Sequence, residues 1–146
     1  MPTTIKYSDI IMYLEAIATA SGQVSGAQHQ FWWRLDPTGN SGTTPLAYKD
    51  FITGTINGIS PAVPIIGTDS NQSNPLQSTF YLLLTTVGGA SDPGGNFYPQ
   101  MPQGGPYLTD TVPPFSTGVP LSNGTTITGA EIITNMTAWL SNGYPA

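Results

Sequence analysis

Glycine and proline break this chain into short pieces. Its 146 residues include 17 Gly and 14 Pro. Proline lacks a backbone N–H and glycine loses the most conformational entropy on folding, so both weaken the interior of a regular element. The longest Gly/Pro-rich stretch runs from residue 88 to residue 126 and has no clear periodicity. A loop of that length is uncommon in a compact domain unless it is functional or wraps around something.

Between these breaks, apolar residues recur at the three-and-four spacing of a helix face. This spacing predicts four helices, over residues 7–20, 45–56, 75–87 and 128–142. A shorter helix or helical turn is expected over residues 27–35. We therefore expect a mostly α fold with long Gly/Pro-rich loops, formed by one domain over the whole chain.

Capping residues place the ends of these helices. Ser8 is the expected N-cap of the first helix. Thr44-Pro45 and Asn74-Pro75 each combine an N-cap with a proline at the first helical position. Thr128 and Glu131 have the spacing of a capping box at the start of the last helix. The two terminal helices have the most regular apolar faces, so we expect them to pack against each other. No hairpin dipeptide flanked by alternating strands is recognised, so little strand is expected.

Composition excludes several classes of function. The chain has 3 Lys and Arg against 8 Asp and Glu, a net charge of −5. Three cations cannot neutralise a run of phosphates, so nucleic acid and anionic membrane surfaces are poor candidate partners. Cysteine is absent and His29 is the only histidine, which removes disulfides, thiolate chemistry and multi-histidine metal sites. No apolar run approaches the roughly 20 residues of a membrane helix, so no membrane insertion is expected.

Two features of the sequence bear on the localisation of the protein: its first residues and its polarity. Met1-Pro2-Thr3-Thr4 lacks the basic and apolar regions of a signal peptide. The low-charge, Thr/Asn/Gly-rich composition nevertheless favours a periplasmic or extracellular protein. Three triplets of the glycosylation type begin at Asn71, Asn123 and Asn135.

The last third of the chain contains a recognisable string. It reads Met101-Pro102-Gln103-Gly104-Gly105-Pro106, then Ala130-Glu131-Ile132-Ile133, Trp139-Leu140 and Asn142-Gly143-Tyr144-Pro145. This resembles the C-terminal end of class I c-type cytochromes, and the order of the expected helices extends the resemblance over nearly the whole chain. In that family a helix like 7–20 precedes a CxxCH haem-attachment motif. The corresponding residues here are Ser25-Gly26-Ala27-Gln28-His29.

The resemblance implies a cytochrome c-like fold and a haem site. His29 stands at the place of the proximal iron ligand, and Met101 at that of the second. Ser25 and Gln28 replace both cysteines, so the haem would be held without covalent bonds. A methionine ligand raises the haem potential and suits electron transfer.

Three alternatives stand beside the haem reading. The chain could be a haem-free cytochrome c-like structural or recognition subunit, with a ring of Phe31-Trp32-Trp33 in the place of the haem. Met101 could simply fill an irregular gap in the core. An enzyme is disfavoured, because no nucleophile elbow surrounds Ser25 and no phosphate-binding loop is present. In each case we expect a protein partner or a homo-oligomer held by uncharged contacts, with Pro113-Pro114-Phe115 as an apolar patch.

Overall fold

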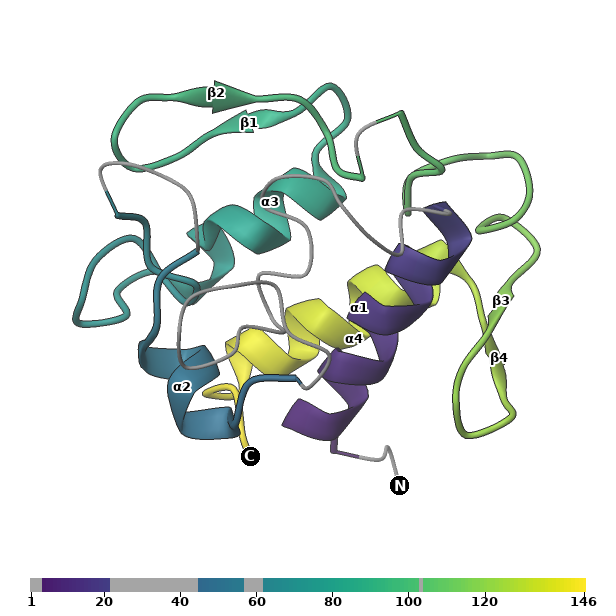
Figure 1. Ribbon diagram of the computed structural model, residues 1–146, viewed down its shortest axis with the longest axis horizontal. Helices are drawn as coiled ribbons and strands as arrows, with labels where there is room; N and C mark the ends of the chain where they lie inside the picture. Colours follow the sequence, from purple (N-terminus) through teal and green to yellow (C-terminus); the bar gives the residue numbers. More distant parts are fainter. Residues whose placement is uncertain (1–3, 22–44, 57–61, 103) are drawn as a thin grey trace.

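The computed structural model describes residues 4–21, 45–56, 62–102 and 104–146 (Figure 1). In these ranges the chain forms four α-helices, one 3₁₀ helix and four two-residue strands. In chain order they are α1 Tyr7–Ser21, α2 Tyr48–Thr53, η1 Pro75–Gln77, α3 Thr79–Thr85, β1 Ala90–Ser91, β2 Phe97–Tyr98, β3 Val119–Pro120, β4 Thr126–Ile127 and α4 Gly129–Ser141.

The expectation of a mostly α, cytochrome c-like fold class is wrong. Helices account for 39% of the residues that the structure describes, and two small antiparallel sheets in the same ranges make it a mixed α/β fold. Strands β1 and β2 pair with Ala90 opposite Tyr98, and strands β3 and β4 pair with Val119 opposite Ile127. Most of these strands lie in the stretch 88–126, where we expected no regular structure.

The two hairpins are built on the same turn. In the first, Gly95 N–H donates to Asp92 O (3.0 Å) and Asp92 N–H donates to Asn96 O (2.9 Å). In the second, Gly124 N–H donates to Leu121 O (3.0 Å) and Leu121 N–H donates to Thr125 O (2.8 Å). The closing glycines have φ of 88° and 87°. Each turn is therefore a three-residue loop that ends in a left-handed glycine, one of the common ways to join two strands.

The terminal helices follow the sequence closely. Helix α4 has both hydrogen bonds of the capping box between Thr128 and Glu131, and Gly143 beyond its end has φ of 85°. Helix α1 covers the expected residues, but Ser8 lies inside it and does not cap it. The start of α1 is instead held by Lys6, whose carbonyl accepts the N–H of Asp9 and whose N–H donates to Asp9 Oδ2.

The two middle helices are shorter than expected. Helix α2 begins at Tyr48, because Ala47 before it is extended (ψ 152°). After it, Thr55 pairs with Pro64 in an isolated β-bridge. The predicted helix 75–87 divides into η1 and α3, because Ser78 between them is extended (ψ 132°). Asn74 makes no side-chain cap and has a left-handed backbone.

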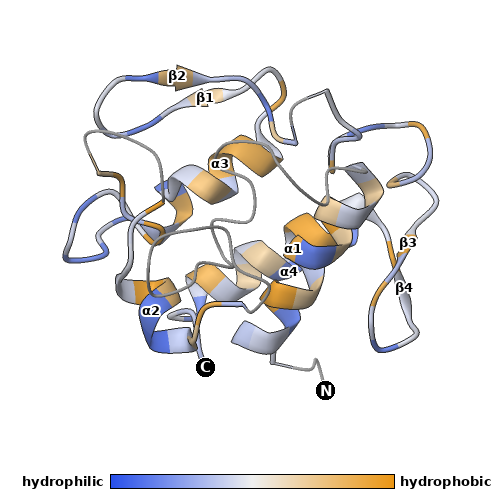
Figure 2. Ribbon diagram, in the orientation of Figure 1, coloured by the Kyte–Doolittle hydropathy of each residue, from blue (hydrophilic) through white to orange (hydrophobic). Residues whose placement is uncertain are grey.

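Side chains of α1, α2 and α4 meet in one hydrophobic core. Trp139 is fully buried, 6.5 Å from the ring of Tyr7 and 6.1 Å from that of Phe51. Asn135 of α4 donates to the hydroxyl of Tyr13 of α1 (2.9 Å). The expected packing of the terminal helices is thus confirmed. Figure 2 shows the apolar bands of α1 and α4 where the two helices overlap in the view.

The stretch 88–126 also contributes to the core. Leu108 and Phe115 are both buried. Gly129, the first residue of α4, donates its N–H to Phe115 O (2.9 Å) and lies against the backbone of Leu108. A Cβ on Gly129 would lie 2.2 Å from Leu108 O, so only glycine allows this approach.

Tyr144 and Pro145 connect four parts of the fold, and we call them the C-terminal junction. Pro145 O accepts from the N–H of Tyr7 (3.1 Å) and from the indole N–H of Trp139 (2.8 Å). Tyr144 O accepts from the hydroxyl of Tyr48 (2.7 Å), and Tyr144 itself donates to Gln72 Oε1 (3.0 Å). The end of the resembled string therefore closes the fold by binding α1, α2, α4 and the loop before η1.

Candidate functional site

The predicted haem site is described only in part. Ser25, Gln28 and His29 lie outside the described residues, as do Phe31-Trp32-Trp33. Only Met101 of the four predicted site residues lies inside them. Ligation by His29 and Met101 together therefore stays a prediction.

Met101 lies at the edge of the core, after β2. Its N–H donates to Leu83 O (2.9 Å) in α3, and its side chain is partly buried against the core. The preceding residue, Gln100, is buried and bridges two loops, because it accepts from Gly88 N–H (3.3 Å) and donates to Thr109 Oγ1 (2.7 Å). This position fits an axial ligand, whose thioether must be reachable, and it equally fits the role of a gap-filling side chain.

Most of the described carboxylates bind the backbone of their own turn or helix end. Those of Asp9, Asp69, Asp92, Asp110 and Glu131 each accept from an N–H within four residues along the chain. A carboxylate used in this way holds a turn or a helix start. Within the ranges that the structure covers, no group of three or more His, Cys, Asp or Glu side chains could hold a metal ion.

Two of these carboxylates have lowered pKa values. The backbone N–H of Ser73 is the main reason why the pKa of Asp69 lies below its usual range, and the N–H of Asn71 adds to it. For Asp92, burial raises the pKa, but hydrogen bonds from Asn96 and from the hydroxyl of Tyr98 together outweigh it and lower the pKa. Both groups stay ionised at neutral pH, as turn caps require.

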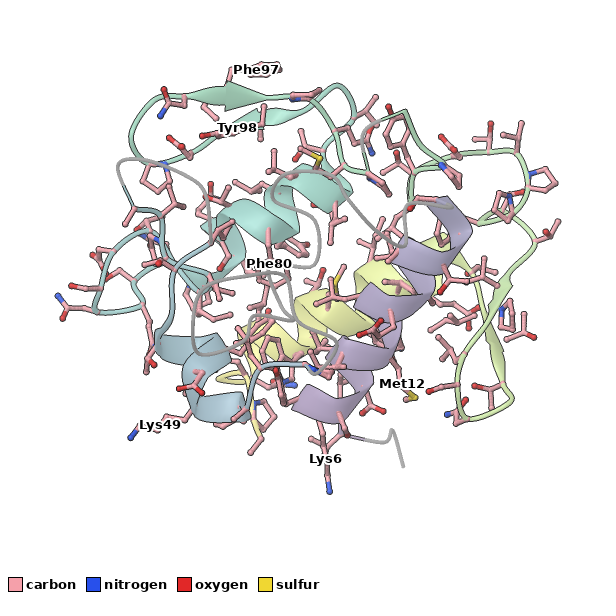
Figure 3. The ribbon with its side chains drawn as sticks, in the orientation of Figure 1. Lys6, Met12, Lys49, Phe80, Phe97 and Tyr98 are labelled. Carbon is pink, nitrogen blue, oxygen red and sulfur yellow. The ribbon has the colours of Figure 1, made fainter. Side chains whose placement is uncertain are left out.

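Two exposed apolar side chains lie near Gly89 in the chain or in space: Val87, two residues before it, and Phe97, across the β1–β2 hairpin. Val87 is 78% exposed and Phe97, in β2, is 64% exposed. The ring of Phe97 lies over Gly89, with Cζ 3.0 Å from the place where a Cβ would be. Figure 3 shows Phe97 on β2, at the outer edge of the molecule. We call Val87 and Phe97 the apolar patch.

The apolar patch was not predicted, and the one that was predicted is wrong in its main residue. Phe115 of Pro113-Pro114-Phe115 is 1% exposed and belongs to the core, while its neighbour Val112 is 58% exposed. The sequence signal for the true patch was Gly88-Gly89, which lets a strand and its phenylalanine approach the end of α3.

The length and the hydropathy of the helices decide whether any of them could cross a membrane. None of the helices in the described ranges has both the length and the apolar character needed to cross a bilayer.

Comparison with known proteins finds no match for this chain among family models, curated proteins or solved structures. The cytochrome resemblance therefore stays a prediction that rests on the residues quoted for it.

Proposed function

We propose that this protein is a haem-free structural or recognition subunit that associates with a protein partner, first of all a second copy of itself, through uncharged contacts. The observation that carries the proposal is the apolar patch, where a phenylalanine and a valine are left exposed although apolar side chains fill the core. Exposed aromatic side chains are enriched at protein interfaces.

The charges of the chain support uncharged recognition. Five carboxylates hold the turns and helix starts described above, and the whole chain has 3 Lys and Arg. An electrostatic docking surface needs clustered charge of one sign, and a nucleic-acid partner needs clustered cations. The proposal therefore assigns a protein partner, no nucleic acid and no chemical reaction to this chain.

Sedimentation over a range of protein and salt concentrations tests the proposal. We expect a concentration-dependent dimer or larger assembly that changes little with salt, because uncharged contacts are not screened. Dissociation on raising salt from low to moderate concentration would show that charge pairs hold the assembly. A chain that stays monomeric at every concentration would contradict self-association.

A matched pair of variants tests the surface itself. Phe97→Ser should weaken self-association at least about tenfold, a loss typical of an interface hot spot. Val112→Ser removes a similarly exposed apolar side chain from a different loop and should leave association unchanged. If the two variants behave alike, the apolar patch is not the interface.

Electron transfer with a non-covalent haem is a second candidate, and the observation in its favour is the partly buried side chain of Met101 at the edge of the core. His29 and Met101 would hold the iron, and the haem would supply one-electron oxidation and reduction. Ser25 and Gln28 would neighbour the haem without bonding to it.

Haem titration decides between the two functions. A Soret band that appears with haem, is lost on acid–acetone extraction and is absent in His29→Ala would establish the haem reading. Met101→Leu should shift this band, whereas Met12→Leu, on α1 (Figure 3), should not. No band under any loading condition would end the haem reading and leave the recognition subunit.

A further inference from the structure

The turn between β3 and β4 contains a reactive arrangement at Asn123. Residues 122–126 are exposed. Asn123 Oδ1 accepts two hydrogen bonds, both from Thr125: one from its N–H (3.0 Å) and one from its hydroxyl (2.6 Å). Between them lies Gly124, which has open space where a Cβ would be.

We propose that Asn123 is a site of spontaneous deamidation. The nitrogen of Gly124 forms a bond to Asn123 Cγ, the bond from Cγ to the amide nitrogen breaks, and ammonia leaves with the proton from Gly124. The resulting succinimide is opened by one water molecule to aspartate or isoaspartate. The step consumes water and releases ammonia, with no oxidation or reduction.

Three features of the turn favour this reaction. The two donors of Thr125 polarise the Cγ carbonyl and stabilise the negative charge that develops on Oδ1 during attack, as the donors of an oxyanion hole do. A side-chain oxygen bound to the N–H two residues later forms an Asx-turn, which folds Cγ back toward the nitrogen of Gly124. The missing Cβ of Gly124 removes the steric barrier to attack.

The chain has two further Asn-Gly pairs. Asn57-Gly58 lies outside the described residues, so Asn142-Gly143 provides the internal comparison. Asn142-Gly143 has the same dipeptide and a similar glycine backbone, with φ of 85° at Gly143 and 87° at Gly124. In both pairs the glycine N–H donates to a carbonyl three residues back, from Gly124 to Leu121 O (3.0 Å) and from Gly143 to Leu140 O (3.4 Å), so this bond does not distinguish the two sites. The N–H two residues after Asn142, that of Tyr144, donates to Trp139 O instead of an asparagine side chain (2.8 Å). The two sites thus differ in the donors to Oδ1, and those at Asn123 come from Thr125.

Deamidation at Asn123 would change the tip of the hairpin. It adds one negative charge to a chain that has a net charge of −5. The isoaspartate product also places an additional methylene in the backbone of a turn whose hydrogen bonds depend on its length.

Peptide mapping of the aged protein tests the proposal. The folded protein is incubated at neutral pH in ¹⁸O-water, digested with chymotrypsin, and analysed by mass spectrometry for deamidated peptides that carry ¹⁸O. We expect Asn123 to react at least about tenfold faster than Asn142, a smaller effect than oxyanion donors have in water-excluded sites. In denaturant the two rates should converge. Equal rates in the folded protein, or a faster Asn142, would overturn the proposal.

Variants of Thr125 test whether its hydroxyl speeds the deamidation of Asn123. Thr125→Val removes the hydroxyl donor and should slow deamidation of Asn123, while Thr125→Ser restores the hydroxyl and should restore the rate. Residue 125 is exposed, and circular dichroism checks that each variant keeps the fold. A Thr125→Val variant that deamidates as fast as the parent chain would refute the role of the hydroxyl and with it the proposed site.

Discussion

The indole of Trp139 both fills the core and holds the chain end. It is fully buried among the rings of Tyr7, Phe51 and Tyr144, at centroid distances of 6.1–6.5 Å. Its N–H donates to Pro145 O. The sequence places Trp139 in the last helix, and the structure shows its burial together with a hydrogen bond that the sequence did not indicate.

Trp139→Ala should lower the free energy of unfolding by about 3–5 kcal/mol, because it leaves a large cavity in the core. Urea unfolding measures this loss. Trp139→Phe keeps a ring in place but loses the N–H donor, so its loss should be smaller. A Trp139→Ala variant as stable as the parent chain would contradict the burial.

Tyr7 makes the stability of the fold depend on pH in the alkaline range. Burial, and to a lesser degree the Asp50 carboxylate, raises the pKa of the Tyr7 hydroxyl well above its usual range. The folded state therefore favours the neutral phenol. This contribution is fully present below the unfolded pKa of about 10 and is lost as pH rises through the folded pKa.

We expect the parent chain to lose stability above about pH 10, and Tyr7→Phe to lose it less steeply, because phenylalanine has no proton to release. Urea unfolding at a series of alkaline pH values measures both slopes. The variant also lacks the hydrogen bond from Tyr7 to Leu46 O, so slopes are compared and not absolute stabilities. Parallel slopes would show that Tyr7 does not cause the loss.

At the scale of elements, long periodic segments were predictable and short strands were not. Helices α1 and α4 have 15 and 13 residues, enough turns for an apolar face to show in the sequence. A two-residue strand has no alternation to detect. The information lies in the turns instead: Asn123-Gly124 and Gly94-Gly95 are hairpin dipeptides, although no alternating pattern of apolar and polar residues flanks either of them.

The sequence could not predict where the middle helices begin or how the residues of the candidate site are held. The proline signatures at 44–45 and 74–75 are compatible with a helix start. The backbone is nevertheless extended at Ala47 and at Ser78, so α2 begins only at Tyr48 and α3 only at Thr79. Likewise, Phe97 is exposed because β2 returns over Gly89 within the β1–β2 hairpin, and Gly88-Gly89 is the only mark that this contact leaves in the sequence. The predicted ligand Met101 could be named from its string, while its anchoring on Leu83 could not.

The left-handed backbone of Gly95 predicts that a methyl group added at this residue lowers the stability of the fold. Gly95→Ala should cost about 1–2 kcal/mol, because a Cβ is disfavoured in the left-handed backbone at this residue. Gly94→Ala, one residue earlier and without a positive φ, is the matched control and should be nearly neutral. Urea unfolding measures both, and cross-strand NMR contacts between Ala90 and Tyr98 follow the hairpin. Equal costs for the two variants would contradict the turn.

At the scale of the whole molecule, low charge governs solubility. The isoelectric point is about 4.2, and repulsion between copies is smallest there. The carboxylates of Asp69 and Asp92 have lowered pKa values. The stability they contribute is present above the unfolded pKa of about 4 and is lost only as pH falls through their lower folded values. Near the isoelectric point the carboxylates of Asp69 and Asp92 therefore still stabilise the turns that contain them.

Light scattering across an acidic pH series should accordingly show maximal self-association near pH 4.2, with the circular dichroism of the folded protein retained. Association that begins only after the folded signal is lost would show that unfolding, and not loss of net charge, drives it. Moving the isoelectric point by adding carboxylates to the surface should move the maximum in parallel.

The C-terminal junction implies an order of folding. The first turn of α1 and the last described residues are joined by the bond from Tyr7 N–H to Pro145 O, so nearly the whole chain forms the loop that this contact closes. Such contacts raise the contact order and slow the search for the native state. During synthesis α1 leaves the ribosome well before its partners, since Asn135 of α4, which binds Tyr13 of α1, is 122 residues later in the chain. The apolar face of α1 must therefore stay uncovered until α4 and Pro145 have been made and the core can close.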